Sequence, residues 1–208
     1  MFISKNTKKF IFISVIGAMQ WLGSCAGTNN STTENEDNST AFTEDSIHRN
    51  LFLEQSKILA NQVNITLITA LTTAIDTHGF EGAVDFCSLR AIPITDSIST
   101  SQHMRIKRIS HKARNQNNDA SALEKYIIAQ YALEQEINKT PIVLSGADGY
   151  TFYAPIYIAG PLCLNCHGNI SSEISQPISE KINQKYPNDK ATGFKLNEIR
   201  GLLRIKEN

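Results

Sequence analysis

Two cysteines and a histidine constrain this chain more than any other feature: Cys163-Leu164-Asn165-Cys166-His167. The spacing C-x-x-C-H is the attachment signature of c-type haem. Two thiols three positions apart can bond the two vinyl groups at one edge of a porphyrin, and the histidine that follows then lies under the iron as an axial ligand. Gly168 leaves room for the chain to turn away from the ring. The motif predicts one covalent haem c with His167 as an iron ligand.

Three other interpretations of the cysteine pair compete with haem: a structural disulfide, a thioredoxin-like redox pair and one half of a zinc site. A redox pair usually lies where a strand meets a helix in a βαβ unit, and the sequence shows no such unit. A zinc site needs further ligands. The remaining histidines have no paired spacing that would supply them: His48, His78, His103 and His111.

The N-terminus has the pattern of a secretory signal. Residues 1–9 are basic, and residues 10–23 form an apolar run that is too short and wrongly flanked for a membrane span. The run ends in Leu22-Gly23-Ser24-Cys25, which resembles a bacterial lipobox, where the leader is cut before a cysteine that is then acylated. We therefore predict a lipoprotein signal peptide at 1–24 and a lipid on Cys25. A cleaved signal with an incidental cysteine and an uncleaved anchor are the alternatives.

Leader and haem motif indicate the same compartment, because bacterial haem attachment takes place outside the cytoplasm. We expect a protein of the cell envelope, anchored to a membrane by lipid and facing the periplasm. Residues 25–44 are polar and predict a disordered tether, and 45–208 form the folded haem domain. After the leader we expect no spanning helix of about 20 apolar residues. Lysine plus arginine and aspartate plus glutamate both number 20, and no basic patch indicates a nucleic-acid partner.

Periodicity and turn signals predict an α+β fold. Helices are expected at 45–78, ended by Gly79, at 81–89, from about 121 to 137 with Asp119 or Ser121 as the cap, and at 175–185. Strands are expected at 104–110, at 141–144 and 150–158 as a hairpin with an Asp148-Gly149 turn, and at 202–206. Pro155 in the second arm of the hairpin predicts an edge, a bulge or an early end of that strand.

One cysteine has no assignment once Cys25 carries lipid and the motif carries haem. Cys87 is either a buried, inert core residue or the second axial ligand of the iron, and the residues alone leave both open. Arg108 and Arg114 are candidates to pair with the haem propionates, since guanidinium binds carboxylate in a bidentate manner. Exposed strand and turn charges are the alternative for both arginines.

Taken together, these segments resemble a bacterial family of mono-haem c-type domains with a PAS-like fold, long described as a domain of unknown function and also found as the sensor part of some histidine kinases. The resemblance covers roughly residues 67–204. It is carried by the segments 83–87, 108–118, 153–156, 163–168 and 186–194, and by Arg200-Gly201. The chain departs from the family at Gln116 and Ala120, where prolines are usual, and at 197–199, where Gly-Asp is common.

The resemblance implies a PAS-like small antiparallel sheet with flanking helices, preceded by a long N-terminal helix. It also implies histidine and cysteine as axial ligands, here His167 and Cys87; Met104, His103 and His111 are the alternatives to Cys87. Six-coordinate iron leaves no open site for substrate, so we expect electron transfer rather than an enzyme. The alternative is a redox or gas (CO/NO) sensor that signals through a separate partner, since no output domain is recognisable. In either case we expect a separate redox or signalling protein as the partner.

Overall fold

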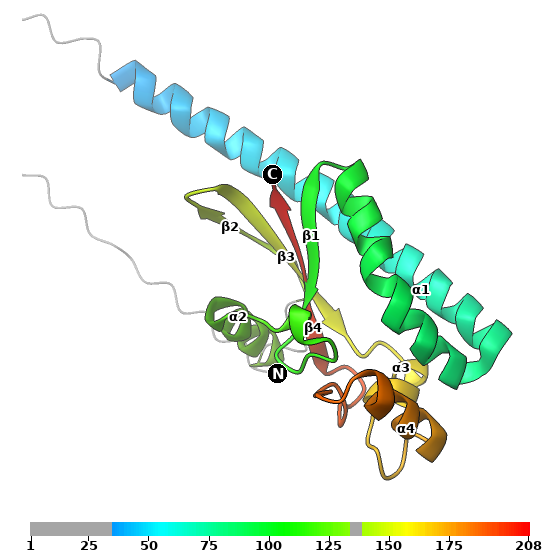
Figure 1. Cartoon of the computed structure of the whole chain (residues 1–208). Coiled ribbons are helices and arrows are strands. Elements are labelled where there is room, and N and C mark those ends of the chain that lie inside the picture. Colours follow the sequence, from blue (N-terminus) through cyan, green and yellow to red (C-terminus); the bar gives the residue numbers. More distant parts are fainter. Residues whose placement is uncertain (1–34, 134–138) are drawn as a thin grey trace, which may run out of the picture. The chain divides into compact units, whose positions relative to one another are not determined.

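A four-stranded antiparallel sheet lies at the centre of the fold, in the order β1-β4-β3-β2 (Figure 1). The structure, a computed structural model, describes residues 35–133 and 139–208, with side chains from residue 43. The signal peptide predicted at 1–24 and the lipid site Cys25 lie outside the described residues. The strands are β1 (Met104–Ile109), β2 (Ile142–Gly146), β3 (Gly149–Tyr157) and β4 (Ile199–Glu207). Thr40–Asn208 forms one unit that contains this sheet.

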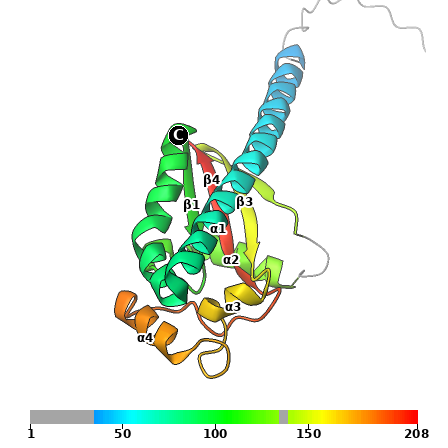
Figure 2. The ribbon, with the colours of Figure 1, turned by 90° about the vertical axis from the view of Figure 1, so that its right-hand side faces the viewer.

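Both faces of the sheet are buried, because the central strands carry apolar residues at successive positions. On β4, Leu203 and Ile205 belong to a core cluster with helix α1, whereas Leu202 belongs to a cluster with α2 (Ala122–Leu133) on the other face. Side chains of a strand alternate between faces, so such a run serves two cores. Figure 2 shows the two halves of α1 side by side on one face of the sheet. The layers confirm the predicted α+β, PAS-like class.

The long helix α1 (Asn35–Ser101) is two helices joined at Gly79. That residue has φ +68° and ψ −179°, a conformation that only glycine adopts readily, and it confirms the predicted helix end. The helix begins at Asn35 instead of residue 45, so residues 35–44 of the predicted tether are helical. The second half runs to Ser101, well beyond the expected end at residue 89, although Pro93 lies inside it.

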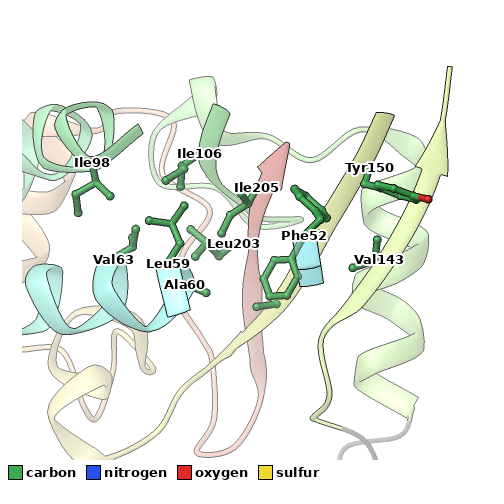
Figure 3. Close-up of a cluster of buried hydrophobic side chains, with 12 residues drawn as sticks. Phe52, Leu59, Ala60, Val63, Ile98, Ile106, Val143, Tyr150, Leu203 and Ile205 are labelled. Carbon is green, nitrogen blue, oxygen red and sulfur yellow. The ribbon is translucent and has the colours of Figure 1, made fainter. Parts of the chain in front are cut away.

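Burial explains why the second half of α1 continues through a proline. Thr95 and Ile98 are buried and Ile94 packs against the main core, and this packing offsets the backbone hydrogen bond that Pro93 cannot donate. Figure 3 shows the core from both halves: Phe52, Leu59, Ala60 and Val63 from the first half and Ile98 from the second surround Ile106, Leu203 and Ile205 of the sheet.

Contrary to the expectation from sequence, α1 is by length and composition apolar enough to cross a membrane. Its segment Thr43–Ser101 contains an 18-residue stretch with mean hydropathy 1.4, of which 22% is buried. The mean hydropathy of this stretch is high because the helix carries apolar residues on two opposite faces. Only one of these faces packs on the sheet.

The helix α2 begins with a capping box. The Ser121 N–H donates to the Glu124 carboxylate at 2.7 Å and the Glu124 N–H donates to the Ser121 hydroxyl at 3.3 Å. Ser121, not Asp119, is therefore the cap. Glu124 is buried and also accepts a hydrogen bond from Arg204 at 2.9 Å. The expected C-terminal end of this helix, near residue 137, lies outside the described residues.

The hairpin of β2 and β3 and the helix α4 (Gln176–Lys185) are confirmed. Pro155 lies beyond the last residue of β3 that pairs with β2, and a bulge follows at Ile156/Tyr157. The missing N–H of Pro155 therefore costs no ladder bond on that side. The short helix α3 (Pro161–His167) follows β3 directly, and no such helix was expected from the sequence. It brings the cysteine motif to the end of the sheet where α1 turns (Figure 1).

Candidate functional site

The cysteine motif forms most of α3. Pro161 occupies the first turn, and a Cβ on Gly168 would lie 2.7 Å from the Leu164 carbonyl oxygen. Only glycine therefore fits where the chain leaves this helix. Residues three apart lie on one face of an α-helix, so Cys163 and Cys166 present their thiols on the same side. Both are partly buried free thiols, and they pack against two different clusters, one around Phe194 and one around Ile178.

His167 is held in a defined orientation. Its Nδ1 lies 2.8 Å from the Ala191 carbonyl oxygen, so Nδ1 carries the proton and donates it. The ring meets Phe194 edge-on, with 6.3 Å between the ring centroids. Burial, followed by the charges of Arg200 and Arg114, lowers the pKa of His167 well below its ordinary value. The imidazole is therefore neutral with Nε2 as the available lone pair, which is the form that binds a metal.

A buried ion pair holds this region together. The Arg114 guanidinium contacts both Asp189 carboxylate oxygens, Nε to Oδ1 at 3.2 Å and Nη2 to Oδ2 at 3.1 Å. The same Nη2 donates to the Cys166 carbonyl at 2.6 Å, and Asp189 Oδ1 accepts from the Ala191 N–H at 2.9 Å. Since Ala191 in turn orients His167, the pair links α3 to the histidine ring. Arg114 thus has a structural task besides the propionate contact predicted for it.

Cys87 comes to the motif from the second half of α1. Burial raises the pKa of its thiol, and the positive charges of Arg108 and Arg114 oppose this shift. Cys166 packs in one cluster with Phe80 and Val84 of this half of α1, and a charge on Cys87 raises the pKa of Cys166. A residue some 80 positions away in sequence is therefore part of the same cluster. The surrounding positive charges would stabilise its thiolate form.

The site contains more positive than negative charge. Arg108 lies on the same face of β1 as Met104 and Ile106, toward α1, and both Arg108 and Arg114 act on His167 and Cys87. Arg200, which the sequence analysis did not single out as a ligand, is the third cation. Burial and repulsion by the other two arginines lower its pKa from 12.5 to about 9, with Asp189 acting in the opposite direction.

Arg200 is incompletely satisfied. Its Nη1 donates to the Ser110 hydroxyl at 2.6 Å and to the Lys112 carbonyl at 3.0 Å, whereas its Nε is buried and has no hydrogen-bond partner. Buried guanidinium groups without counter-charges are costly, so this arrangement fits an anionic ligand. In the sequence, Arg200 could have been identified from the Arg200-Gly201 pair, which is part of the family pattern.

The alternatives to a haem site find little support here. Within residues 43–133 and 139–208, no three His, Cys, Asp or Glu side chains gather around a possible metal ion, and Cys87, Cys163 and Cys166 form no disulfide. The alternative axial ligands also lie elsewhere. Met104 packs in the main core and His103 is exposed.

His111, the remaining alternative ligand, lies against Phe194. It is half-buried, its ring meets Phe194 edge-on with centroids 6.0 Å apart, and its Nδ1 is buried without a partner. Burial, then Arg200 and Lys112, lower its pKa. His111 and His167 thus both contact the Phe194 ring edge-on.

Two comparisons with known proteins found a match to this chain. A solved structure described as "Crystal structure of the cyanobacterial heme-protein Tll0287" superposes with a TM-score of 0.56 at 19% identity, covering 74% of this chain and 92% of that chain. This likeness shows the fold. No curated protein is significantly similar. The model of the Tll0287-like family matches residues 28–207, nearly the whole chain. The chain therefore belongs to the Tll0287-like family.

Proposed function

We propose that the protein is an exported, lipid-anchored c-type haem protein that acts in electron transfer. The observation that carries the proposal is the arrangement on α3: two free thiols on one helix face, followed by a neutral histidine whose Nδ1 is engaged and whose Nε2 is available. This donor set fits covalent haem, with Cys163 and Cys166 as the attachment points and His167 as an axial ligand. The structural relative, a haem protein by its description, supports the same cofactor.

The charge of the site supports this assignment independently. Three arginines face one carboxylate, Asp189, in a largely buried cluster. Haem c has two propionates, and a cysteine ligand would add a thiolate, so a bound haem brings the missing negative charge. Arg108 and Arg200 are the better candidates to pair with the propionates, since Arg114 already pairs with Asp189.

Cys87 is the proposed second axial ligand. Its half of α1 packs against Cys166 through Val84, and its thiol lies in the field of Arg108 and Arg114. Bound haem supplies a one-electron iron couple. A thiolate donor stabilises the ferric state, so we expect a midpoint potential below that of His/Met cytochromes. With both axial positions taken by protein, the protein is proposed to be an electron carrier and not an enzyme.

Covalent haem is tested by expressing the protein together with a haem-attachment system. Acid–acetone will leave the pigment on the protein, and a denaturing gel will stain for haem peroxidase activity. Cys163→Ser combined with Cys166→Ser will abolish the stain, whereas Cys87→Ser, the matched control, will keep it. A colourless wild-type protein under these conditions would overturn the proposal.

A specific observation also supports a sensor function. The proposed ligand Cys87 belongs to α1, the same long element that begins at Asn35. Exchange of this ligand for CO or NO would thus act directly on the second half of α1, which packs on the sheet. If the protein is a sensor, ferrous protein will bind CO or NO at low concentration and change its shape or partner. Iron that ignores both gases but exchanges electrons rapidly with small donors supports the carrier.

Export and lipid attachment rest on the leader and on Leu22-Gly23-Ser24-Cys25. The partners expected are therefore a membrane, through the lipid, and a separate redox or signalling protein of the cell envelope. Mass spectrometry of the mature N-terminus will find an acylated cysteine. An unprocessed Met1 in native membranes contradicts this part of the proposal and leaves the haem assignment intact.

A further inference from the structure

The first half of α1 carries two apolar faces. One is buried against the sheet and includes Phe52, Leu59 and Val63. The other points away from the sheet and is exposed. Its residues, with their exposed fractions, are Ile47 (53%), Leu51 (66%), Ile58 (73%), Ile65 (56%) and Ile68 (60%). Single exposed apolar residues need no explanation, but five in one row on one helix do. We name these five residues the outer stripe.

The outer stripe follows a heptad pattern. Consecutive members are separated by four, seven, seven and three positions. One polar residue divides each gap of seven into steps of three and four: Glu54 in the first gap and Asn61 in the second. The complete row therefore alternates between steps of four and three. This period of 3.5 residues keeps a seam facing a second helix along its length, and residues 47–68 span about 32 Å at 1.5 Å per residue. A helix that merely covers a sheet needs only the buried face.

We propose that the outer stripe is a parallel coiled-coil interface between two copies of this chain. No charged residue occurs between Ile58 and Ile75, so two identical stripes meet there without charge repulsion. Parallel alignment sets isoleucine against isoleucine and places Asn61 against Asn61 of the partner copy, where each amide can satisfy the other. Polar residues in such a seam fix the register of the paired helices at a cost in stability, and Asn61 and Glu54 are the two polar positions here.

The two polar positions of the heptad pattern, Glu54 and Asn61, also affect how two copies would pair. Glu54 is paired with Lys57 on its own helix at 2.7 Å, which offsets the repulsion between two glutamates at that step. A lipid bilayer is the competing occupant of the outer stripe, since this part of α1 is apolar enough for a span. However, the opposite face of the same helix is already packed on the sheet, which excludes lipid from half of the circumference.

The first test is the association state of the full chain carrying Cys25→Ser, which removes the proposed lipid. Sedimentation will show a dimer at micromolar concentration. Ile58→Asn with Ile65→Asn will weaken the dimer by about 100-fold or more, because four buried isoleucines are lost per dimer. The control Thr66→Asn with Thr73→Asn changes exposed residues off the outer stripe and will remain dimeric. An unchanged far-UV circular dichroism spectrum will show that the variants fold.

The second test is the position of the contact. With oxidant, Ile58→Cys and Ile65→Cys will each form a disulfide with its own copy, and Thr66→Cys will not. A wild-type chain that stays monomeric up to roughly 100 μM overturns the proposal. So does a Cys25→Ser chain that binds phosphatidylcholine vesicles through the outer stripe, with binding lost in Ile58→Asn, Ile65→Asn and no change in association state. These outcomes are independent of whether haem is bound.

Discussion

The buried pair of Arg114 and Asp189 allows a quantitative test of how the site is held together. We consider Asp189→Asn, which keeps the shape of the side chain and removes its charge. The two side chains are 15% and 5% exposed. Loss of one partner of a buried ion pair costs roughly 3–5 kcal/mol. The asparagine oxygen still accepts from the Ala191 N–H, and Arg114 still donates to Cys166, so we expect the lower end, about 3 kcal/mol.

For a domain of this size, each kcal/mol shifts the Tm by roughly 2–4 °C, so Asp189→Asn will lower the Tm by about 6–12 °C. Thermal unfolding is followed by circular dichroism and by the haem absorption band. The matched control is Asp148→Asn, which breaks an ion pair with Lys206 at 3.0 Å whose carboxylate is 76% exposed. An exposed pair contributes little, so the control will unfold with wild type.

The same variant tests the propionate contact predicted for Arg114. If a propionate supplies a second counter-charge, Asp189→Asn will cost the haem-loaded protein less than it costs the haem-free Cys163→Ser, Cys166→Ser protein. If Asp189→Asn destabilises both proteins equally, Arg114 pairs with Asp189 and with no propionate. The reasoning about burial is refuted if Asp189→Asn is no more destabilising than Asp148→Asn.

Four further outcomes follow. Cys87→Ser will raise the midpoint potential and admit CO, because an anionic ligand is lost; unchanged spectra and potential would show an ordinary core residue. The low-spin spectrum expected for iron with two protein ligands will persist when the pH falls below about 6.5, the ordinary imidazole pKa, since the lowered pKa of His167 moves proton competition for Nε2 to more acid values; loss of the spectrum at about pH 6.5 would contradict this. Gly79→Ala will destabilise the protein by about 1 kcal/mol or more, measured by urea unfolding, because φ is +68° there; no change in midpoint would contradict it. Cys25→Ser will abolish acylation, checked by mass spectrometry of the N-terminus, and leave the haem intact; a lipid that persists on the variant would contradict attachment at Cys25.

Local chemistry was sufficient for much of this protein. The spacing of Cys163, Cys166 and His167 specifies the proposed cofactor because thiols and imidazole at these positions match one edge and the iron of a porphyrin. The helix end at Gly79 could be predicted because glycine adopts a positive φ at little cost. The strand and hairpin positions followed from alternation and from Asp148-Gly149, since these signals act over a few residues.

Other features depended on contacts between distant parts of the chain. The helix through Pro93 could not be predicted, because its stability comes from Thr95 and Ile98 packing in the core and not from local propensity. The start of α1 at Asn35 was missed for a related reason: polar composition indicated a tether, whereas residues that precede a stable helix can extend it.

The site itself was only half visible in the sequence. The resemblance suggested that Cys87 belongs with the motif, and the turn of α1 at Gly79 brings the half of the helix that carries Cys87 against Cys166. Arg114 lies in a different segment of the chain from Asp189 and Arg200. No local sequence pattern could therefore predict the electrostatic field that these side chains produce together. Charge and burial at a site are sums over everything that the fold brings near it. The identity of the motif is therefore a property of the sequence, and its electrostatics are a property of the tertiary structure.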